Sequence, residues 1–165
     1  MKDEIQKIRE LTKEIQFAMM TTWGTEGLQS RPMTLLETDF DDSLWFFVSQ
    51  DSTVAEDVEG GAEVNLAFAH PGKKSFVSVS GEAEILEDRA KIHELWKPLY
   101  QAFFPKGETD EKLRLLRVEL RSADYWDSPS SKVVQLLGMA KAVISGKRAG
   151  EAGELGEHGH AEKGA

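Results

Sequence analysis

The arginine in Ser30-Arg31-Pro32-Met33-Thr34 is one of two features of this 165-residue chain that could do chemistry. A planar guanidinium among apolar neighbours suits a phosphate or a carboxylate. Pro32 lacks an N–H, which places the segment at a sheet edge or in an irregular strand. A structural ion pair of Arg31 is the alternative, and the residues by themselves favour it.

The second feature is the turn Ser49-Gln50-Asp51-Ser52-Thr53, which joins an aromatic segment to a helix start. Backbone N–H groups at a helix start, together with hydroxyls, bind anions without a large positive charge. This matters because the formal net charge of -9 repels phosphates unless a site is locally basic or built from backbone donors. Plain helix capping by Asp51 or Ser52 remains the simpler interpretation.

Other chemistries lack their motifs. The chain has no cysteine, which excludes disulfides, thiolate metal sites and cysteine nucleophiles. The nucleophile elbow, the dinucleotide-binding glycine motif and the P-loop are also missing. His158 and His160 form a tail His-Gly-His, which is a poor metal site without carboxylate partners, so we expect no metal. Lys73 and Lys74 stand in a turn, where solvation is the simpler interpretation.

The charge also bears on location and partners. An acidic surface repels nucleic acid and anionic lipid, so we expect neither as a partner. The N-terminal segment 1–14 is charged from its second residue, unlike a signal peptide, and no apolar run is long enough to span a membrane. These features favour a cytoplasmic protein.

Hydrophobic periodicity predicts the elements that must position these residues. Hairpin-linked strands with few helices, and no βαβ repeat, favour a mainly β fold with flanking helices, built as an antiparallel barrel. We expect one folded domain over 1–146 and a disordered acidic tail over 147–165. The expected helices cover 3–18, 53–59, 87–104 (interrupted by Pro98) and 133–144, and the expected strands cover 18–23, 28–38, 44–49, 63–69, 77–85 and 113–126.

Several segments, taken in order, resemble the FMN-binding split barrel family related to pyridoxamine 5'-phosphate oxidase. They are Ser30-Arg31-Pro32-Met33, Leu44-Trp45-Phe46-Phe47-Val48-Ser49 followed by Asp51-Ser52, Asn65-Leu66-Ala67-Phe68 and Phe76-Val77-Ser78-Val79-Ser80-Gly81-Glu82-Ala83. A later part of the chain looks specifically like general stress protein 26. It consists of Asp124-Tyr125-Trp126-Asp127-Ser128-Pro129, Lys132-Val133-Val134 and Gly138-Met139-Ala140-Lys141-Ala142. The resemblance covers about residues 5–148.

The resemblance implies an antiparallel split β-barrel of the FMN-binding type. It also implies a homodimer with the cofactor at the interface, where the cofactor is FMN or, alternatively, FAD. Pro32, Met33 and Thr34 would line the isoalloxazine ring with backbone atoms. Phe47, Val48 and Ser49 would flank the cofactor.

The resemblance assigns the remaining cofactor-binding residues to the two ends of the flavin. Arg31 would contact the phosphate or the ribityl chain, and Ser52 and Thr53 would hold the phosphate. Lys74 belongs to the same predicted set. Trp126 would come from the partner subunit and cover one end of the ring.

Four departures from the family pattern bear on function. Val54 stands where members that bind phosphate strongly often have a lysine, and losing one such contact weakens binding by about 1–3 kcal/mol. Leu36 replaces another lysine, and Phe76 replaces a flavin-contacting glutamine. Ser128-Pro129-Ser130-Ser131 replaces the Arg-Leu-His motif that grips the substrate phosphate. The sequence therefore predicts modest FMN binding and argues against vitamin B6 oxidation.

Three hypotheses for function follow. The first is a flavin-dependent oxidoreductase, whose catalytic residues the sequence does not identify because no side chain stands out as an acid or base. The second is a non-catalytic flavin-binding protein of the stress response. The third is a barrel for another planar cofactor, such as a deazaflavin or haem. A split barrel with an empty site is the plainest alternative.

Overall fold

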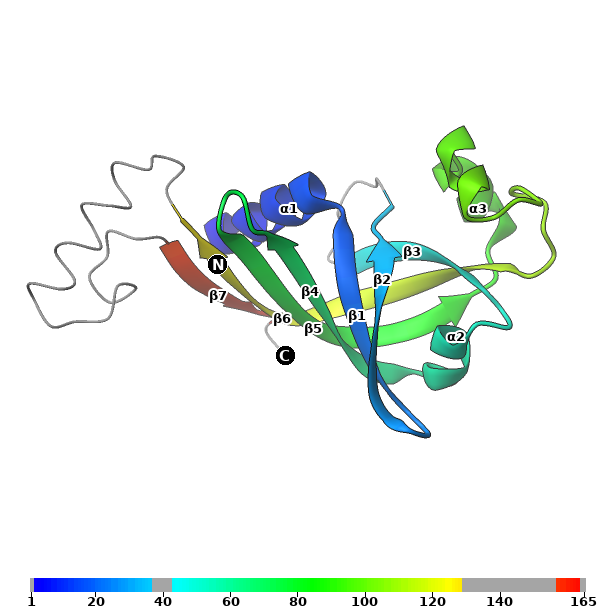
Figure 1. Cartoon of the computed structure of the whole chain (residues 1–165), viewed down its shortest axis with the longest axis horizontal. Coiled ribbons are helices and arrows are strands. Elements are labelled where there is room, and N and C mark those ends of the chain that lie inside the picture. The colour runs from blue at the N-terminus through cyan, green and yellow to red at the C-terminus, as the bar shows by residue number, and fades with distance from the viewer. Residues whose placement is uncertain (1, 37–42, 129–156, 164–165) are drawn as a thin grey trace, which may run out of the picture.

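The computed structural model describes residues 2–36, 43–128 and 157–163, which form a single antiparallel sheet with short helices packed around it (Figure 1). The strands lie in the order β2-β1-β4-β5-β6-β3, and β7 pairs with β6. No helix among the described residues is long and apolar enough to cross a membrane. The elements are α1 (Lys2–Ile15), β1 (Phe17–Gly24), β2 (Gly27–Thr34), β3 (Ser43–Ser49), α2 (Thr53–Asp57), β4 (Ala62–His70), β5 (Ser75–Leu86), α3 (Arg89–Leu95), the 3-10 helix η1 (Pro98–Ala102), β6 (Leu113–Asp127) and β7 (Glu157–Glu162).

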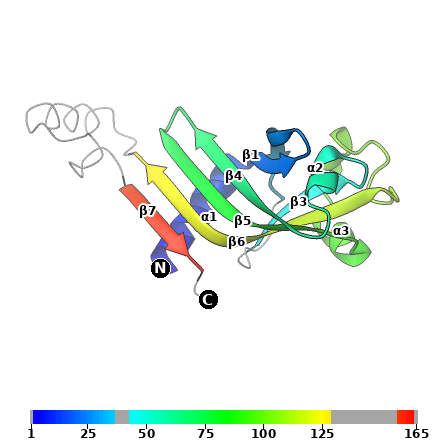
Figure 2. The same ribbon diagram turned by 90° about the horizontal axis from the view of Figure 1, so that it is seen from below.

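The predicted first helix is three residues too long at its C-terminal end. Its apolar face is correct, since Ile8 and Leu11 are buried against the sheet. The helix ends at Ile15 because Gln16 takes a positive φ of 62°, which breaks the helical run. Ala18 therefore lies in β1, where it pairs with Phe68 and is buried. Figure 2 shows α1 crossing behind β5 and β6.

The predicted hairpin is confirmed as β1 and β2. Gly24 pairs with Gly27 across a two-residue connection, and Gly27 has a positive φ of 97° that favours glycine. The second strand ends at Thr34, earlier than expected. The other edge of β1 pairs with β4, so the hairpin forms one side of the barrel.

The predicted helix over 87–104 is in fact two helices. α3 ends at Leu95, and Lys97 is extended, with φ −127° and ψ 148°, because a residue that precedes proline avoids the helical region. Pro98 then starts η1, where its missing N–H costs nothing. The break lets η1 fold back over the sheet, and this contact shapes the candidate site.

The long strands β5 and β6 are bent together by a bulge. The pairing of β5 with β6 shifts register between Ser80 and Gly81, and Arg121 is the extra residue on β6. Gly81 is required there, because a β-carbon would lie 2.3 Å from the backbone oxygen of Glu119. The bend lets one sheet curve around its own apolar interior.

Two apolar clusters hold the fold together. The larger one fills the barrel between the sheet and α1, and Phe46, Leu66 and Val79 are among its fully buried members. The smaller one lies on the opposite side of β3 and β6, under α3 and η1. The smaller cluster consists of Leu36, Trp45, Phe47, Ile92, Leu95, Tyr100, Leu113 and Leu115.

The tail differs from the expectation of disorder over its last part, because residues 157–162 form strand β7 on the edge of β6. Ala161 is buried in the main core. Gly159 sits against the ring of Tyr125, where a β-carbon would come within 2.3 Å of the ring. These contacts, made by small residues without an apolar period, could not be foreseen from the pattern. The predicted helix at 133–144 lies outside the described residues.

The hydroxyl of Tyr125 links β6 to β7 and gives a prediction about pH. It donates a hydrogen bond to Oε1 of Glu157 at 2.9 Å. Burial, followed by this bond, raises the pKa of Tyr125 to about 12. Tyrosine in the unfolded chain ionises near pH 10, so the free energy of unfolding should fall as pH rises from about 10 to about 12.

Urea unfolding of the wild type and Tyr125→Phe across that pH range measures this contribution. The phenylalanine variant cannot ionise at this position, so its unfolding free energy should fall less steeply than that of the wild type. The two proteins differ only at this position, so the difference between their curves isolates the contribution of Tyr125. Parallel curves for the two proteins would contradict the link.

Candidate functional site

The barrel is open between β2 and β3. These are the two end strands of the sheet, and among the described residues each pairs on one side only, β2 with β1 and β3 with β6. One backbone hydrogen bond crosses the opening, from the N–H of Leu36 to the carbonyl oxygen of Trp45 at 2.8 Å. The prediction that the Pro32 segment is a sheet edge is confirmed. Edge strands carry backbone donors and acceptors that a ligand can use.

An apolar cavity of about 290 Å³ lies at this opening. β2 supplies the three residues predicted to line the ring, Pro32, Met33 and Thr34, and β3 supplies Phe47, which was predicted to flank the cofactor. The structure therefore brings together two segments that the sequence separates by more than a dozen residues. The other described residues that line the cavity are Phe17, Leu36, Tyr100, Phe103 and Phe104.

Aromatic packing fixes one wall of this cavity. The ring centroid of Phe47 lies 5.6 Å from that of Trp96, 5.4 Å from that of Tyr100 and 6.1 Å from that of Phe104. These tilted and edge-on arrangements are the favourable ones for aromatic pairs. The wall exists because the break before Pro98 turns η1 toward β3.

Arg31 lies beyond the cavity, at the end of the opening nearest α2. Its Nη1 donates to Oγ1 of Thr22 at 2.5 Å, and its Nη2 donates to Oδ2 of Asp57 at 3.1 Å. The hydroxyl of Thr22 in turn donates to the same carboxylate oxygen at 2.6 Å. The structure therefore contains the structural ion pair that the residues alone favoured. A phosphate at this end would share Arg31 with Asp57.

The hydroxyl-rich turn acts as a helix cap in this structure. Ser52 Oγ accepts from the N–H of Ala55 at 3.3 Å and donates to the carbonyl oxygen of Ser49 at 2.7 Å. Thr53 is exposed and lies one turn before Asp57 on the same face of α2. Of the other residues in the predicted set, Val48 is buried in the main core, so only its backbone could flank a ligand.

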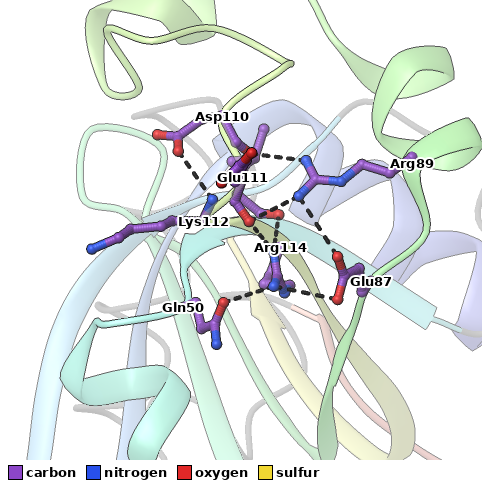
Figure 3. Close-up of polar contacts among 8 residues, drawn as sticks. Gln50, Glu87, Arg89, Asp110, Glu111, Lys112 and Arg114 are labelled. Carbon is purple, nitrogen blue, oxygen red and sulfur yellow. Dashed lines mark hydrogen bonds and ion pairs between the residues drawn. The ribbon is translucent and has the colours of Figure 1, made fainter.

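A polar network attaches the turn after β3 to the start of β6 (Figure 3). Arg114 Nη2 donates to Oε1 of Gln50 at 2.6 Å and forms an ion pair with Glu87 at 3.3 Å. Its Nη1 donates to the carbonyl oxygen of Glu111 at 2.6 Å. Lys112 pairs with Asp51 and, through that hydrogen bond, lowers the pKa of the carboxyl. This network holds the end of β3 in place beside the opening.

Arg89 extends the network to the loop before β6. Its Nη1 donates to the carbonyl oxygen of Asp110 at 2.9 Å, and its Nη2 donates to that of Glu111 at 3.0 Å (Figure 3). The guanidinium thus adds a second donor to each of two loop carbonyls, since that of Asp110 also accepts from the N–H of Leu113 and that of Glu111 from Arg114. The two hydrogen bonds from Arg89 attach the loop that follows η1 to α3. The aromatic wall lies just before this loop in the chain.

Two members of the predicted set lie away from the cavity. Lys74 is in the β4–β5 turn, with a positive φ of 53°, and does not line the opening. Trp126 lies on the outer face of β6, where the ring of His158 stacks on it at a centroid distance of 5.1 Å and an interplanar angle of 13°. If Trp126 meets the cofactor, it does so from another subunit, as the resemblance implied.

The sequence suggested that His158 and His160 lack a carboxylate partner. The structure shows that they have one. Nδ1 of His160 lies 2.8 Å from Oδ1 of Asp124, and Nε2 of His158 lies 3.8 Å from the same oxygen. Even so, no group of three or more histidines and carboxylates among the described residues is placed to hold a metal ion.

Sequence reasoning missed the aromatic wall and the partners of Arg31. The signal for the wall was the group of aromatic residues shortly after Pro98, namely Tyr100, Phe103 and Phe104. Proline interrupts a helix, so the residues after it can present their rings to another part of the fold. Asp57 and Thr22 gave no comparable signal, because their meeting with Arg31 depends on how α2 packs against β1 and β2.

An antiparallel barrel left open between two edge strands, with an apolar cavity in the opening, defines the split-barrel class of fold. The family model for pyridoxamine 5'-phosphate oxidase-like proteins matches residues 3–150. The chain belongs to this family, and the resemblance to its general stress protein 26 members is confirmed.

Relatives agree with this assignment. Protein bli-3 of Neurospora crassa is 29% identical over 158 residues, which cover 87% of this chain and 76% of that protein. The general stress FMN/FAD binding protein of Xanthomonas citri is 32% identical with a TM-score of 0.71, covering 79% of this chain and 93% of that one. A protein assigned to general stress protein 26 from Jannaschia sp. CCS1 covers 99% of this chain and 100% of its own, at 20% identity and a TM-score of 0.78, and supports the fold.

The pairing of Arg31 with Asp57 should contribute to stability. Their side chains are only 19% and 13% exposed, so removing one leaves the other poorly hydrated. We expect Arg31→Ala to lower the free energy of unfolding by about 1–3 kcal/mol. A double-mutant cycle with Asp57→Asn, followed by urea unfolding, should show a coupling of about 1 kcal/mol.

The exposed pair Arg121 and Glu63 is the matched control for this cycle. Its side chains are 53% and 78% exposed, so its coupling should be close to zero. Equal coupling in the two pairs would show that the position of Arg31 in the opening has no special energetic role.

Proposed function

We propose that this protein binds FMN in the opening between β2 and β3. The observation that carries the proposal is the cavity, where the Pro32, Met33 and Thr34 segment of one edge strand meets Phe47 of the other. Membership of a family with FMN-binding relatives supports it. The flavin ring would lie in the cavity, with its ribityl phosphate directed toward Arg31 and α2.

The cavity suits a flat, uncharged ring system. Its described lining contains no charged side chain, and five of the nine lining residues are aromatic. A volume of about 290 Å³ is at the small end of ligand pockets, enough for one ring system rather than a whole dinucleotide. The unpaired backbone edges could bind the polar rim of the ring. FAD carries the same ring and the same first phosphate, so this argument covers it as well.

The residues at the Arg31 end of the opening, where the phosphate would lie, predict modest affinity for FMN. Arg31 directly precedes Pro32 of the cavity lining, and it is already paired with Asp57. Val54 is buried and supplies no charge where a second cation would help. A phosphate must therefore compete with a carboxylate for one guanidinium, which costs part of the attraction.

We propose that the bound flavin acts in oxidation and reduction, for which it supplies hydride and electron transfer. The described cavity residues include no carboxylate, imidazole or amine, so this chain's part would be to position the ring and exclude water. A non-catalytic flavin-binding protein is the second candidate, favoured by the same lack of acid and base groups. Reduction of the bound flavin by NAD(P)H, followed by reoxidation during repeated turnover, would distinguish the first from the second.

Comparison of FMN with riboflavin tests the placement of the phosphate. Arg31→Ala should weaken FMN binding by about 5- to 150-fold, since one charge-assisted contact is lost, while riboflavin binding should change little. Asp57→Asn should act in the opposite direction and tighten FMN, because it removes the competing carboxylate. Dissociation constants from flavin fluorescence quenching measure both effects.

Arg121→Ala is the control, since it also removes an arginine but lies on the outer face of β6. An FMN dissociation constant that is the same in Arg31→Ala and the wild type would remove Arg31 from the site. A wild type that binds neither flavin would contradict the proposed function itself.

We further propose a homodimer with the site at its interface. Across the outer face of the sheet, Ala69 pairs with Phe76, and Phe76 pairs with Trp126. Phe17 continues this row on β1 and also lines the cavity. The side chain of Phe17 is 59% exposed, that of Phe76 is 40% exposed and that of Trp126 is 45% exposed. An exposed apolar row therefore runs from the cavity across the sheet. Such a row is typical of a surface that a partner covers.

Light scattering at micromolar concentration should give the mass of a dimer. Phe76→Glu should produce monomers, because it places a charge in the apolar row, and should weaken FMN binding in parallel. Leu28→Glu is the control at the far end of the β1–β2 hairpin, an exposed apolar residue that lies outside the cavity. A monomeric wild type would overturn both the dimer and the shared site.

A further inference from the structure

The apolar row that crosses the outer face of the sheet continues onto β7. His158 is the register partner of Trp126 across β6 and β7, as Phe76 is across β5 and β6. The imidazole lies flat on the indole, with ring centroids 5.1 Å apart and an angle of 13° between the two planes. The side chain of Trp126 nevertheless stays 45% exposed, so part of its surface remains for contact with another molecule.

The residues of β7 hold this imidazole in place. The inner face of the strand carries small residues that let it lie close to β6. Ala161 is buried in the main core, and a β-carbon at Gly159 would come within 2.3 Å of the ring of Tyr125. Because side chains alternate along a strand, His158 and His160 lie on its outer face. Contacts other than the stack therefore set the position of His158 along β6.

The proposed dimer brings this end of the row to the cavity of the partner subunit. In a two-fold symmetric dimer each contact occurs twice, so a row that packs on its own copy pairs one of its ends with the other. Phe17, at one end of the row, lines the cavity, and Trp126 lies at the other end. Such packing places the axis near the middle of the row, between β4 and β5. Trp126 then faces the cavity beside Phe17 of the partner subunit.

We propose that His158 is a positioning residue of the flavin site. By stacking on Trp126, it holds the indole in the orientation in which the indole covers the flavin ring bound by the partner subunit. This inference rests on the proposed flavin binding and on the proposed dimer, and it makes β7 part of the cofactor site. An indole at an exposed strand position without such a restraint samples several rotamers. Fixing one rotamer in advance lowers the ordering cost of binding.

Replacement of His158 tests the stack directly. His158→Ala removes the ring and should weaken FMN binding by about 3- to 10-fold, the effect of one favourable aromatic pair. His158→Phe keeps a flat ring at the same place and should restore most of the affinity. His160→Ala is the matched control, because His160 lies on the same face, is similarly exposed and contacts Asp124 at 2.8 Å. This control should leave the FMN dissociation constant unchanged.

A second measurement follows the indole itself. Protein labelled with fluorotryptophan gives one fluorine resonance for each of its four tryptophans, and Trp126→Phe identifies that of Trp126. In the cofactor-free protein, His158→Ala should move this resonance toward that of free fluorotryptophan, whereas His160→Ala should leave it in place. Added FMN should shift the resonance of the wild type, and the shift should be smaller in His158→Ala.

The outcomes separate this inference from the function on which it rests. A wild type that binds FMN with no shift of the Trp126 resonance would overturn the inference and leave flavin binding intact. An unchanged FMN dissociation constant in His158→Ala would also overturn it. So would equal losses in His158→Ala and His160→Ala, since these would reflect the attachment of β7 rather than the stack. A monomeric wild type would remove the partner subunit from the site, and a chain that binds no flavin would overturn the proposed function together with this inference.

Discussion

The missing pairing between β2 and β3 is the constraint on which the rest of the structure depends. A sheet that curves this strongly would otherwise close, and among the described residues one backbone hydrogen bond, from Leu36 to Trp45, crosses the opening. Pro32 lies in the edge strand, where proline is tolerated because its absent N–H disrupts no ladder. The opening exposes backbone groups that a closed barrel would use up, and the candidate site lies there.

The two apolar clusters stabilise this opening from opposite sides. The main core supports the inner faces of β2 and β3, where Met33 and Val48 point. The smaller cluster supports the outer face of β3 through Phe47 and the aromatic residues of η1. The edges are thus held apart by packing on both sides. The packing that stabilises the fold thus also surrounds the cavity, which favours a preformed place for a flat ring.

One side of β6 is covered along most of its length by two different strands. The first half of β6 pairs with β3, and its second half pairs with β7, so one long strand carries two partners along the same edge. β7 is held by the hydroxyl of Tyr125 and by the burial of Ala161, not by an apolar pattern of its own. An uncovered edge invites pairing with another chain. Among the described residues β7 also pairs on one side only, so what distinguishes the opening between β2 and β3 is the apolar cavity that it holds.

The sequence by itself determined the local features. Alternation predicted the strands, Pro98 predicted an interruption, and the motifs around Arg31 and Phe47 pointed to one cofactor-binding family. Only the tertiary structure decided which distant segments meet, such as Arg31 with Asp57, or β7 with β6. The physical reason is that periodicity and turn chemistry act over a few residues, whereas long-range contacts depend on how whole elements pack.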